Sequence, residues 1–179
     1  MRRRRRIPSV HAVAEVPSFA SVAERHLDDV HAYLVYLTRD RGVAEDLTAE
    51  TFERALRLWR RFDPRRGSAR TWLCQVARTV ALDHFRAEDR RRRREGRYAV
   101  AELREGEEAV FGEGLSPALE EALGRLSAAE REVVALRVLL ELDGEAAARV
   151  LGISTTACST RLSRALQKLE KEVSAGVAA

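Results

Sequence analysis

A short basic turn between two tryptophans is the part of this sequence with the most evident chemical use. Residues 59–73 carry five arginines, with Trp59 near one end and Trp72 near the other. Arginine side chains bind phosphates, and aromatic rings stack on unpaired bases. The stretch therefore suits a single strand of nucleic acid. Taken alone, it fits an ordinary helix–helix connection with solvated arginines equally well.

Three helical patterns precede and follow this turn and must position it. Apolar residues recur at spacings of three and four over residues 19–37, 43–62 and 68–86. Gly42 is predicted to end the first helix, and Ser68 is predicted to cap the third. Three helices of this length can bury a small shared core, so the sequence predicts a three-helix bundle.

A second helical unit is predicted after a flexible linker at residues 95–116, where the periodicity fades and Glu-Gly pairs recur. Ser127 begins a capping-box pattern. Over residues 143–171, Gly152 predicts a tight turn between a short helix and a longer one, which is typical of a helix-turn-helix. The side chains left to face DNA are Thr155, Thr156, Ser159, Thr160, Arg161 and Arg164.

Composition and charge favour an all-α protein that binds a polyanion. The chain has only ten glycines and four prolines in 179 residues, and it is rich in strong helix formers. Its formal charge of +4 is segregated. Residues 57–97 hold fourteen arginines against five acids, whereas residues 98–121 hold seven glutamates against one arginine. A basic segment followed by an acidic one makes nucleic acid the leading partner.

Several classes of protein lack support in the sequence. Cys74 and Cys158 are far apart, and the four histidines make no zinc-like cluster, so no metal or cofactor is expected. No apolar run approaches the length of a membrane span. Glycine-rich phosphate loops and nucleophile–base arrangements are absent, which argues against an enzyme. We therefore expect a cytoplasmic, non-enzymatic protein.

Both informative stretches together resemble a bacterial RNA polymerase sigma factor of the extracytoplasmic-function (ECF) group. Residues 44–52 resemble the region 2 helix that docks on the polymerase clamp, and residues 61–86 resemble the part that opens and reads the −10 element. Residues 126–134 and 151–165 resemble region 4, which binds the −35 element. The resemblance implies a basic arm (1–17), region 2 (18–94), a linker (95–116), region 4 (117–173) and a tail (174–179).

The resemblance also implies roles for particular residues. Core RNA polymerase would contact Asp46, Glu50, Thr51 and Arg54. The displaced −10 strand would contact Arg65, Arg66, Ser68, Arg70, Trp72, Arg78 and Arg86. Promoter DNA at −35 would contact the six residues named above for the helix-turn-helix.

Some positions depart from residues common in the family. Ala49 stands where a glutamine is common, Thr79 replaces a frequent asparagine, and Ser159 replaces a frequent lysine. The departure in the recognition helix predicts an unusual −35 preference or weaker −35 binding.

One alternative function and two further partners remain open at this stage. A helix-turn-helix repressor or activator would explain residues 143–171 but would leave the tryptophan-flanked turn unexplained. Many relatives are held by an anti-sigma factor, and nothing in the sequence proves or excludes one. The ending Ala178-Ala179 resembles a degradation signal read by the ClpXP protease, although a frayed tail is the simpler interpretation.

Overall fold

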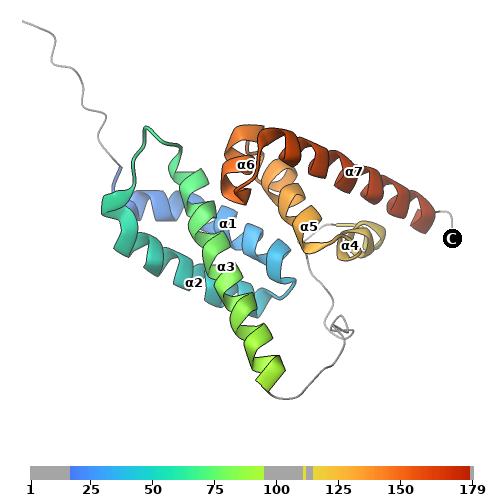
Figure 1. The fold of residues 1–179 in the computed structure, drawn as a ribbon, viewed down its shortest axis with the longest axis horizontal. Coiled ribbons are helices and arrows are strands. Elements are labelled where there is room, and N and C mark those ends of the chain that lie inside the picture. Colours follow the sequence, from blue (N-terminus) through green and yellow to red (C-terminus); the bar gives the residue numbers. More distant parts are fainter. Residues whose placement is uncertain (1–16, 95–110, 112–114, 178–179) are drawn as a thin grey trace, which may run out of the picture.

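The computed structural model describes residues 17–94, 111 and 115–177, and these ranges contain helices and turns but no strand. The helices form an N-terminal unit over residues 19–94 and a C-terminal unit over residues 117–177 (Figure 1). The all-α prediction is therefore confirmed. Within the described ranges, no helix has both the length and the apolar character needed to cross a membrane. The predicted basic arm, except for Pro17, lies outside the described residues.

The first helix, α1 (Phe19–Thr38), begins where predicted, since the Ser18 hydroxyl accepts a hydrogen bond from the N–H of Ser21 at 3.2 Å. It ends at Arg39, whose φ of 58° is left-handed. Gly42 does not end this helix, contrary to the prediction. Asp40 already caps the next helix, so the turn is complete before the glycine is reached.

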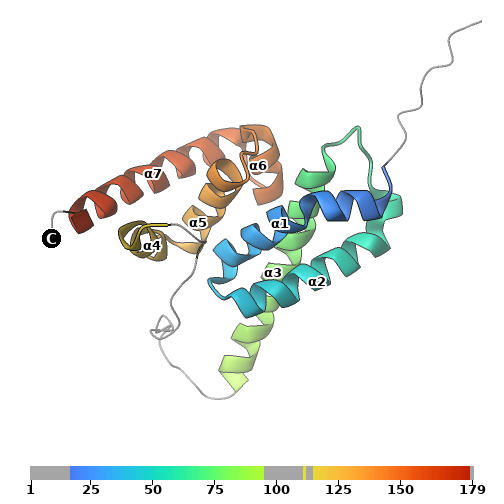
Figure 2. The ribbon, with the colours of Figure 1, turned by 180° about the vertical axis from the view of Figure 1, so that it is seen from behind.

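The second helix, α2 (Arg41–Leu58), continues into a 3₁₀ turn, η1 (Trp59–Arg61). A loop then leads to α3 (Ala69–Arg94), a long helix that packs on both α1 and α2 (Figure 2). Ser68 caps α3 as predicted, because its hydroxyl accepts from the N–H of Thr71 at 3.1 Å. The core of this unit is formed by buried side chains of all three helices, including Val30, Leu34, Leu47, Leu73 and Val80.

The C-terminal unit begins with α4 (Pro117–Gly124) and α5 (Ala128–Val134). The capping box predicted at Ser127 is present: its N–H donates to Glu130 at 2.8 Å, and its hydroxyl accepts from the N–H of Glu130 at 3.3 Å. A π-helical turn, η2 (Ala135–Leu139), continues α5. This turn buries Ala135 and Leu136 in the core.

The last two helices, α6 (Gly144–Leu151) and α7 (Thr155–Val177), form the predicted helix-turn-helix. Gly152 adopts a left-handed φ of 67° at the end of α6, which is the conformation that glycine accepts most readily. Helix α7 extends past residue 173, where we predicted a tail to begin. Its distal part lies along α4, and Glu172 pairs there with Arg125.

The two units are not held apart in this structure. Helix α3 packs on α6, and α1 packs on α5 and η2, so one continuous apolar core runs through both units. Phe111 is buried although it lies in the predicted linker, and its ring packs on Tyr36 with 5.2 Å between centroids. Periodicity alone did not predict this contact between the units.

Candidate nucleic-acid interface

Three aromatic rings form a wall beside the loop between η1 and α3. Trp59 stacks on Phe62 with 4.8 Å between ring centroids and an interplanar angle of 10°. Trp72 meets both rings edge-on or tilted, at 5.7 and 5.5 Å. Because Trp72 is only half-buried, part of its surface remains available for a further planar group such as a base.

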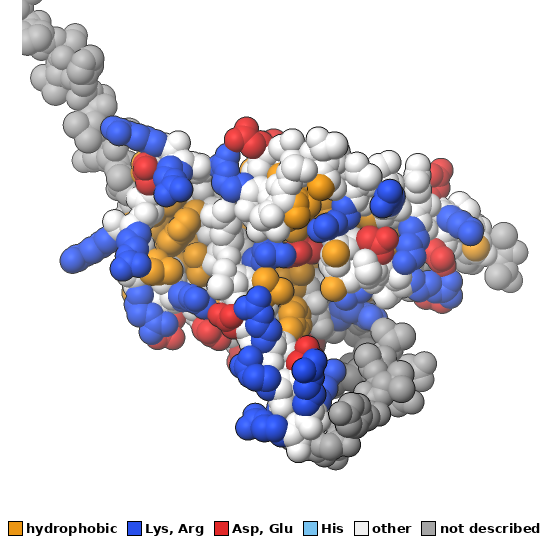
Figure 3. Space-filling view, in the orientation of Figure 1, with side chains coloured by type: hydrophobic (Ala, Val, Ile, Leu, Met, Phe, Trp, Pro, Cys, Tyr) orange, Lys and Arg blue, Asp and Glu red, His pale blue; other side chains and the backbone are white. Residues whose placement is uncertain are grey.

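Asp63 orders the backbone of the loop through two hydrogen bonds. These bonds use the backbone N–H groups of Arg65 and Arg66, so they do not engage the two arginine side chains. The Asp63 carboxylate accepts from the N–H of Arg65 at 2.9 Å, and its carbonyl accepts from the N–H of Arg66 at 3.0 Å. Both arginine side chains are exposed. Basic side chains gather around this loop and along α3 (Figure 3). A cavity of about 480 Å³ opens between the loop and the start of α3, with Trp72 in its lining.

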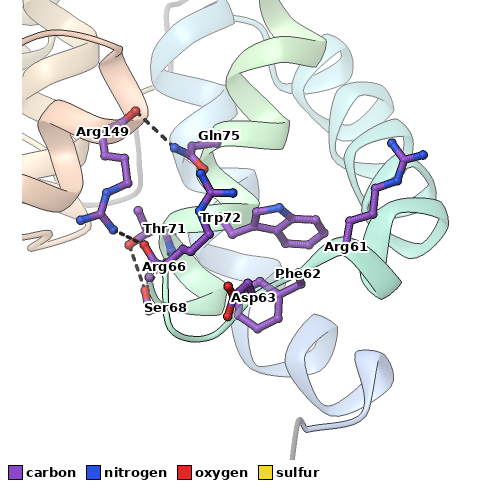
Figure 4. Close-up of a pocket in the computed structure, with 10 residues that line it drawn as sticks. Arg61, Phe62, Asp63, Arg66, Ser68, Thr71, Trp72, Gln75 and Arg149 are labelled. Atoms are coloured by element: carbon purple, nitrogen blue, oxygen red, sulfur yellow. Dashed lines mark hydrogen bonds between the residues drawn. The ribbon is translucent and has the colours of Figure 1, made fainter.

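The C-terminal unit contributes one residue to this cavity. Arg149 of α6 points at the loop, where its guanidinium donates to the carbonyl of Arg66 at 2.7 Å (Figure 4). Its own carbonyl accepts from Gln75 of α3 at 3.2 Å. The approach is close, since a Cβ atom added at Gly67 would lie 2.7 Å from the Arg149 guanidinium. Arg149 thus occupies one side of the cavity.

Arg70, predicted to bind the −10 strand, is instead paired within the N-terminal unit. Its Nε and Nη2 atoms lie 2.8 and 2.9 Å from the two carboxylate oxygens of Asp29 on α1. His26 also lies 3.1 Å from that carboxylate. Only Nη2 donates a hydrogen bond, since Nε has no hydrogen-bond partner, so the contact is an ion pair with a single hydrogen bond. In this structure Arg70 therefore holds α3 against α1.

Arg78, also predicted to bind the −10 strand, is paired across the two units. Its Nε donates to Glu132 of α5 at 2.8 Å, and the same carboxylate oxygen accepts from the Tyr33 hydroxyl of α1 at 2.9 Å. Glu132 is 7% exposed. Burial, and next the negative charge of Glu132, raise the pKa of Tyr33 well above its usual value, so the hydroxyl stays protonated and donates.

The start of α7 presents the side chains expected of a recognition helix. The Ser154 hydroxyl accepts from the N–H of Ala157 at 3.1 Å, while Cys158 and Ala165 turn into the core. A shallow cavity of about 570 Å³ lies between this helix and the start of α5. Of the predicted residues, Arg161 is half-buried and the others are exposed, namely Thr155, Thr156, Ser159, Thr160 and Arg164.

Comparison with known proteins identifies the family of this chain. Models of sigma-70 region 2 and sigma-70 region 4 match residues 22–91 and 116–169. The ECF RNA polymerase sigma factor SigC of Mycobacterium tuberculosis is 38% identical over 142 residues, which cover 79% of this chain and 75% of SigC. The chain belongs to the ECF RNA polymerase sigma factors.

Two further relatives agree with this family. The ECF sigma factor BldN of Streptomyces coelicolor is 32% identical over 164 residues, which cover 88% of this chain but only 61% of the length of BldN. The sigma factor RpoE of Bartonella quintana, solved with the anti-sigma factor NepR, has a TM-score of 0.73 at 23% identity. That match covers 89% of this chain and 98% of RpoE, and it shows a shared fold.

The residues of this sigma factor predicted to bind polymerase lie on α2, away from the C-terminal unit. Asp46 and Glu50 are exposed. Arg54 is partly exposed and pairs with Asp83 of α3 at 3.1 Å. Thr51 is completely buried, and its hydroxyl donates to the Leu47 carbonyl at 2.7 Å. Thr51 is therefore a core residue and is not accessible to a partner in this conformation.

The remaining residues predicted to bind the −10 strand, Ser68 and Arg86, differ in how strongly their side chains are engaged by partners within the chain. Ser68 is exposed, but its hydroxyl caps α3. Arg86 is exposed and lies 3.4 Å from Asp83, in the same helix. An exposed pair of this kind contributes little and is easily exchanged for a phosphate. Arg86 is thus more available to DNA than Arg70 or Arg78.

No group of three or more potential metal ligands occurs among the described residues of the sigma factor. Cys74 and Cys158 are both free and buried. Burial raises the pKa of both thiols, that of Cys74 to about 12. A thiol with such a pKa is a poor nucleophile near neutral pH, so both residues serve as small apolar core side chains.

The residues that sequence reasoning missed lie where the two units of the sigma factor meet. They are Tyr33, Gln75, Glu132 and Arg149. The sequence held one signal for Glu132, because this acidic residue directly precedes an apolar run that starts at Val133. Its partners Tyr33 and Arg78 are 99 and 54 residues away in the chain. No local pattern can identify partners at such separations.

Proposed function

We propose that this sigma factor binds core RNA polymerase, recognises promoters through their −35 and −10 elements, and starts transcription of a specific set of genes. It would act in the cytoplasm as a non-catalytic subunit. The observation that carries this proposal is the cavity beside the loop at residues 62–68, walled by aromatic rings and flanked by exposed arginines. A repressor that binds only duplex DNA does not need a cavity for an unpaired base.

At the −10 element, an extruded base would enter this cavity and stack on Trp72. Taking a base out of the duplex costs a few kcal/mol, which stacking and phosphate contacts can offset. Arg65 and Arg66 would hold the phosphates on either side. Asp63 supports this role because it orders the loop backbone without pairing with either of these two side chains.

At the −35 element, the start of α7 would enter the major groove of duplex DNA. Its exposed threonines and Ser159 would contact base edges and phosphates, and Arg164 would contact phosphates or guanine. Ser159 in place of a longer cation supports the predicted unusual −35 preference, since a hydroxyl reaches less far into the groove. Reporter assays across −35 variants test this, and a preference for the group's usual −35 sequence would contradict it.

Run-off transcription tests the proposed function directly. The purified chain is mixed with core polymerase and fragments of genomic DNA, and the start sites are mapped. We expect discrete transcripts that require the chain. A chain that binds duplex DNA tightly by itself, yet starts no transcript with core enzyme, would support the repressor or activator alternative.

Two further partners belong to this proposal. A sigma factor of similar fold has been solved bound to an anti-sigma factor, and we extend this kind of partner to the present chain. Co-purification of a tagged chain with a co-transcribed protein would test it. The proposed ClpXP signal at Ala178-Ala179 lies outside the described residues. Changing both to Asp should lengthen the cellular half-life, and an unchanged half-life would eliminate the idea.

A further inference from the structure

Two arginines from different units meet near the end of α4, and the chain supplies neither of them with a counter-ion. Arg39 closes α1, and Arg131 lies in α5, a helix on which α1 packs. The Nε atoms of both side chains are buried and have no hydrogen-bond partner in the described part of the chain. Burial, and next the positive charge of Arg39, lower the pKa of Arg131. The two guanidiniums are therefore close enough to repel each other.

The acidic residues that directly flank these arginines in the sequence are engaged elsewhere. Asp40 caps α2 with its carboxylate, Glu130 belongs to the capping box of α5, and Glu132 is bound by side chains of α1 and α3. Within the ranges that the structure describes, neither arginine forms an ion pair with a carboxylate. Burying a charge without a counter-ion is costly, so an unpaired buried cation indicates a ligand that is absent from the chain itself.

The groups that contact the two guanidiniums are an aromatic ring and the backbone at the end of α4. Arg39 lies over the ring of Phe111, 5.7 Å from its centroid. A Cβ atom added at Gly124 would lie 3.3 Å from Nη2 of Arg39, so the glycine leaves room for this side chain. Arg131 donates to the carbonyl of Leu126, just past the end of α4. A helix C-terminus carries only about half a negative charge, so it does not balance two guanidiniums.

We propose that Arg39 and Arg131 bind a phosphate group, either as free phosphate or as the phosphoryl end of a small nucleotide. This inference goes beyond the proposed function and does not depend on it, since neither residue belongs to the surfaces proposed for DNA or polymerase. Both residues are half-buried, so a small anion can reach them from solvent. A small rotation of either side chain would present its Nε and Nη atoms together to the same ligand.

The chemistry of the pair favours phosphate over a carboxylate. Each guanidinium is a planar fork of N–H donors that matches two oxygens of one phosphate. A phosphoryl group carries about −1.5 to −2 charges near pH 7, which balances two arginines. A single carboxylate carries one charge and would leave the second arginine without a counter-ion. Phosphate would also give both buried Nε atoms an acceptor.

The test measures phosphate binding to the full chain by isothermal titration calorimetry and by the shift of its melting temperature. The probes are inorganic phosphate and adenosine diphosphate, and each is compared with sodium chloride at the same ionic strength. The variants are Arg39→Gln and Arg131→Gln. Arg41→Gln is the matched control, because it removes an exposed cation next to the turn between α1 and α2.

We expect phosphate to raise the melting temperature of the wild type more than chloride does, since a ligand that binds only the folded site stabilises the fold. Each variant should bind phosphate at least about tenfold more weakly, because it loses charge-assisted hydrogen bonds. Arg41→Gln should match the wild type. The melting shift is taken with and without phosphate for each protein, so a variant that is merely less stable does not imitate a lost site.

The two probes distinguish the sources of the phosphate group. Tighter binding of adenosine diphosphate would assign the site to a nucleotide, and tighter binding of inorganic phosphate would assign it to the free ion. A wild type that responds to both probes no more than to chloride would overturn the proposal, and water would then fill the space between the arginines.

An equal loss of binding in Arg41→Gln and Arg39→Gln would also overturn the proposal, because the effect would then reflect net charge alone. If Arg131→Gln fails to fold, Arg131→Lys replaces it, since lysine keeps the charge but lacks the planar pair of donors. Phosphate binding by Arg131→Lys as tight as that of the wild type would contradict the proposed contact of the guanidinium.

Discussion

The two surfaces that we propose bind DNA differ in how much of each is open. On α7, the predicted −35 residues are exposed apart from Arg161, and the helix-turn-helix is complete within its own unit. On α3 and its preceding loop, Arg70 and Arg78 are already paired with carboxylates, and Arg149 occupies one side of the cavity. The comparison shows that the surface proposed for −35 DNA is open, whereas part of the surface proposed for the −10 strand already pairs with groups of the chain itself.

The largest expected effect concerns the loop. Replacing Arg65 and Arg66 together by Ala would remove the two charge-assisted phosphate contacts that we propose for them and should reduce open-complex formation by about 100-fold or more. Polymerase binding should stay nearly intact, because α2 is untouched. Permanganate footprinting and co-purification with core enzyme measure the two steps. Arg25→Ala with Arg41→Ala, both at exposed positions, is the control. If polymerase binding were lost instead, the result would indicate that the loop has a structural role and would contradict the proposed role in binding the −10 strand.

The next effect tests whether the two units behave as one. Leu136→Ala empties a completely buried site of the C-terminal unit and should cost about 2–5 kcal/mol of unfolding free energy. Both tryptophans lie in the N-terminal unit. If the shared core couples the units, urea unfolding followed by tryptophan fluorescence should shift to lower urea. The exposed Leu166→Ala serves as the control, and an unshifted tryptophan transition would mean independent units.

A smaller effect is expected on the open surface. Replacing Arg161 and Arg164 by Ala should weaken binding to a −35 duplex by about tenfold or more, because we propose that each arginine contacts DNA directly. If both contact phosphates, the slope of log affinity against log salt should fall by about 2. Binding titrations at several salt concentrations measure this. Lys171→Ala, near the far end of α7, should change neither quantity, and an equal change there would indicate only a general charge effect.

The smallest effect is a pH dependence confined to the C-terminal unit. The N–H of Ser127, aided by the Ser127 hydroxyl and Lys168, holds the pKa of Glu130 below its usual value. Stability from this carboxylate is therefore fully present above its unfolded pKa of about 4.3, and it is lost as the pH falls through the lower folded value. Circular dichroism melts from about pH 6 to pH 3 should show wild type and Glu130→Gln converging. A constant difference would exclude this contribution.

Much of the C-terminal unit could be predicted from local sequence signals. Ser127 caps the start of α5, Asp143 caps the start of α6, and Gly152 ends α6 in a left-handed turn. Each of these residues acts on backbone groups only a few positions away. Such signals are complete in a short window of sequence, so they identified the helix-turn-helix and its exposed face. The end of the first helix was missed because Arg39, rather than a glycine, adopts the left-handed turn.

The pairing of charged residues could not be predicted in this way. A helical pattern indicates that Arg70 and Arg78 lie off the apolar stripe, but it does not say whether solvent, DNA or another helix faces them. In the structure Arg70 pairs with Asp29, 41 residues away, and Arg78 pairs with Glu132, 54 residues away. Thr51 shows the same limit, since this polar residue, predicted to contact polymerase, is completely buried in the core.

The sequence by itself determined the helices, their caps, the tryptophan-flanked turn and the order of the two units, because these depend on backbone preferences and periodicity over short distances. Only the tertiary structure decided that the units pack together, that Glu132 joins Tyr33 and Arg78, and that Arg149 reaches the cavity beside Trp72. Those contacts depend on how folded surfaces meet in three dimensions, which no short stretch of sequence contains.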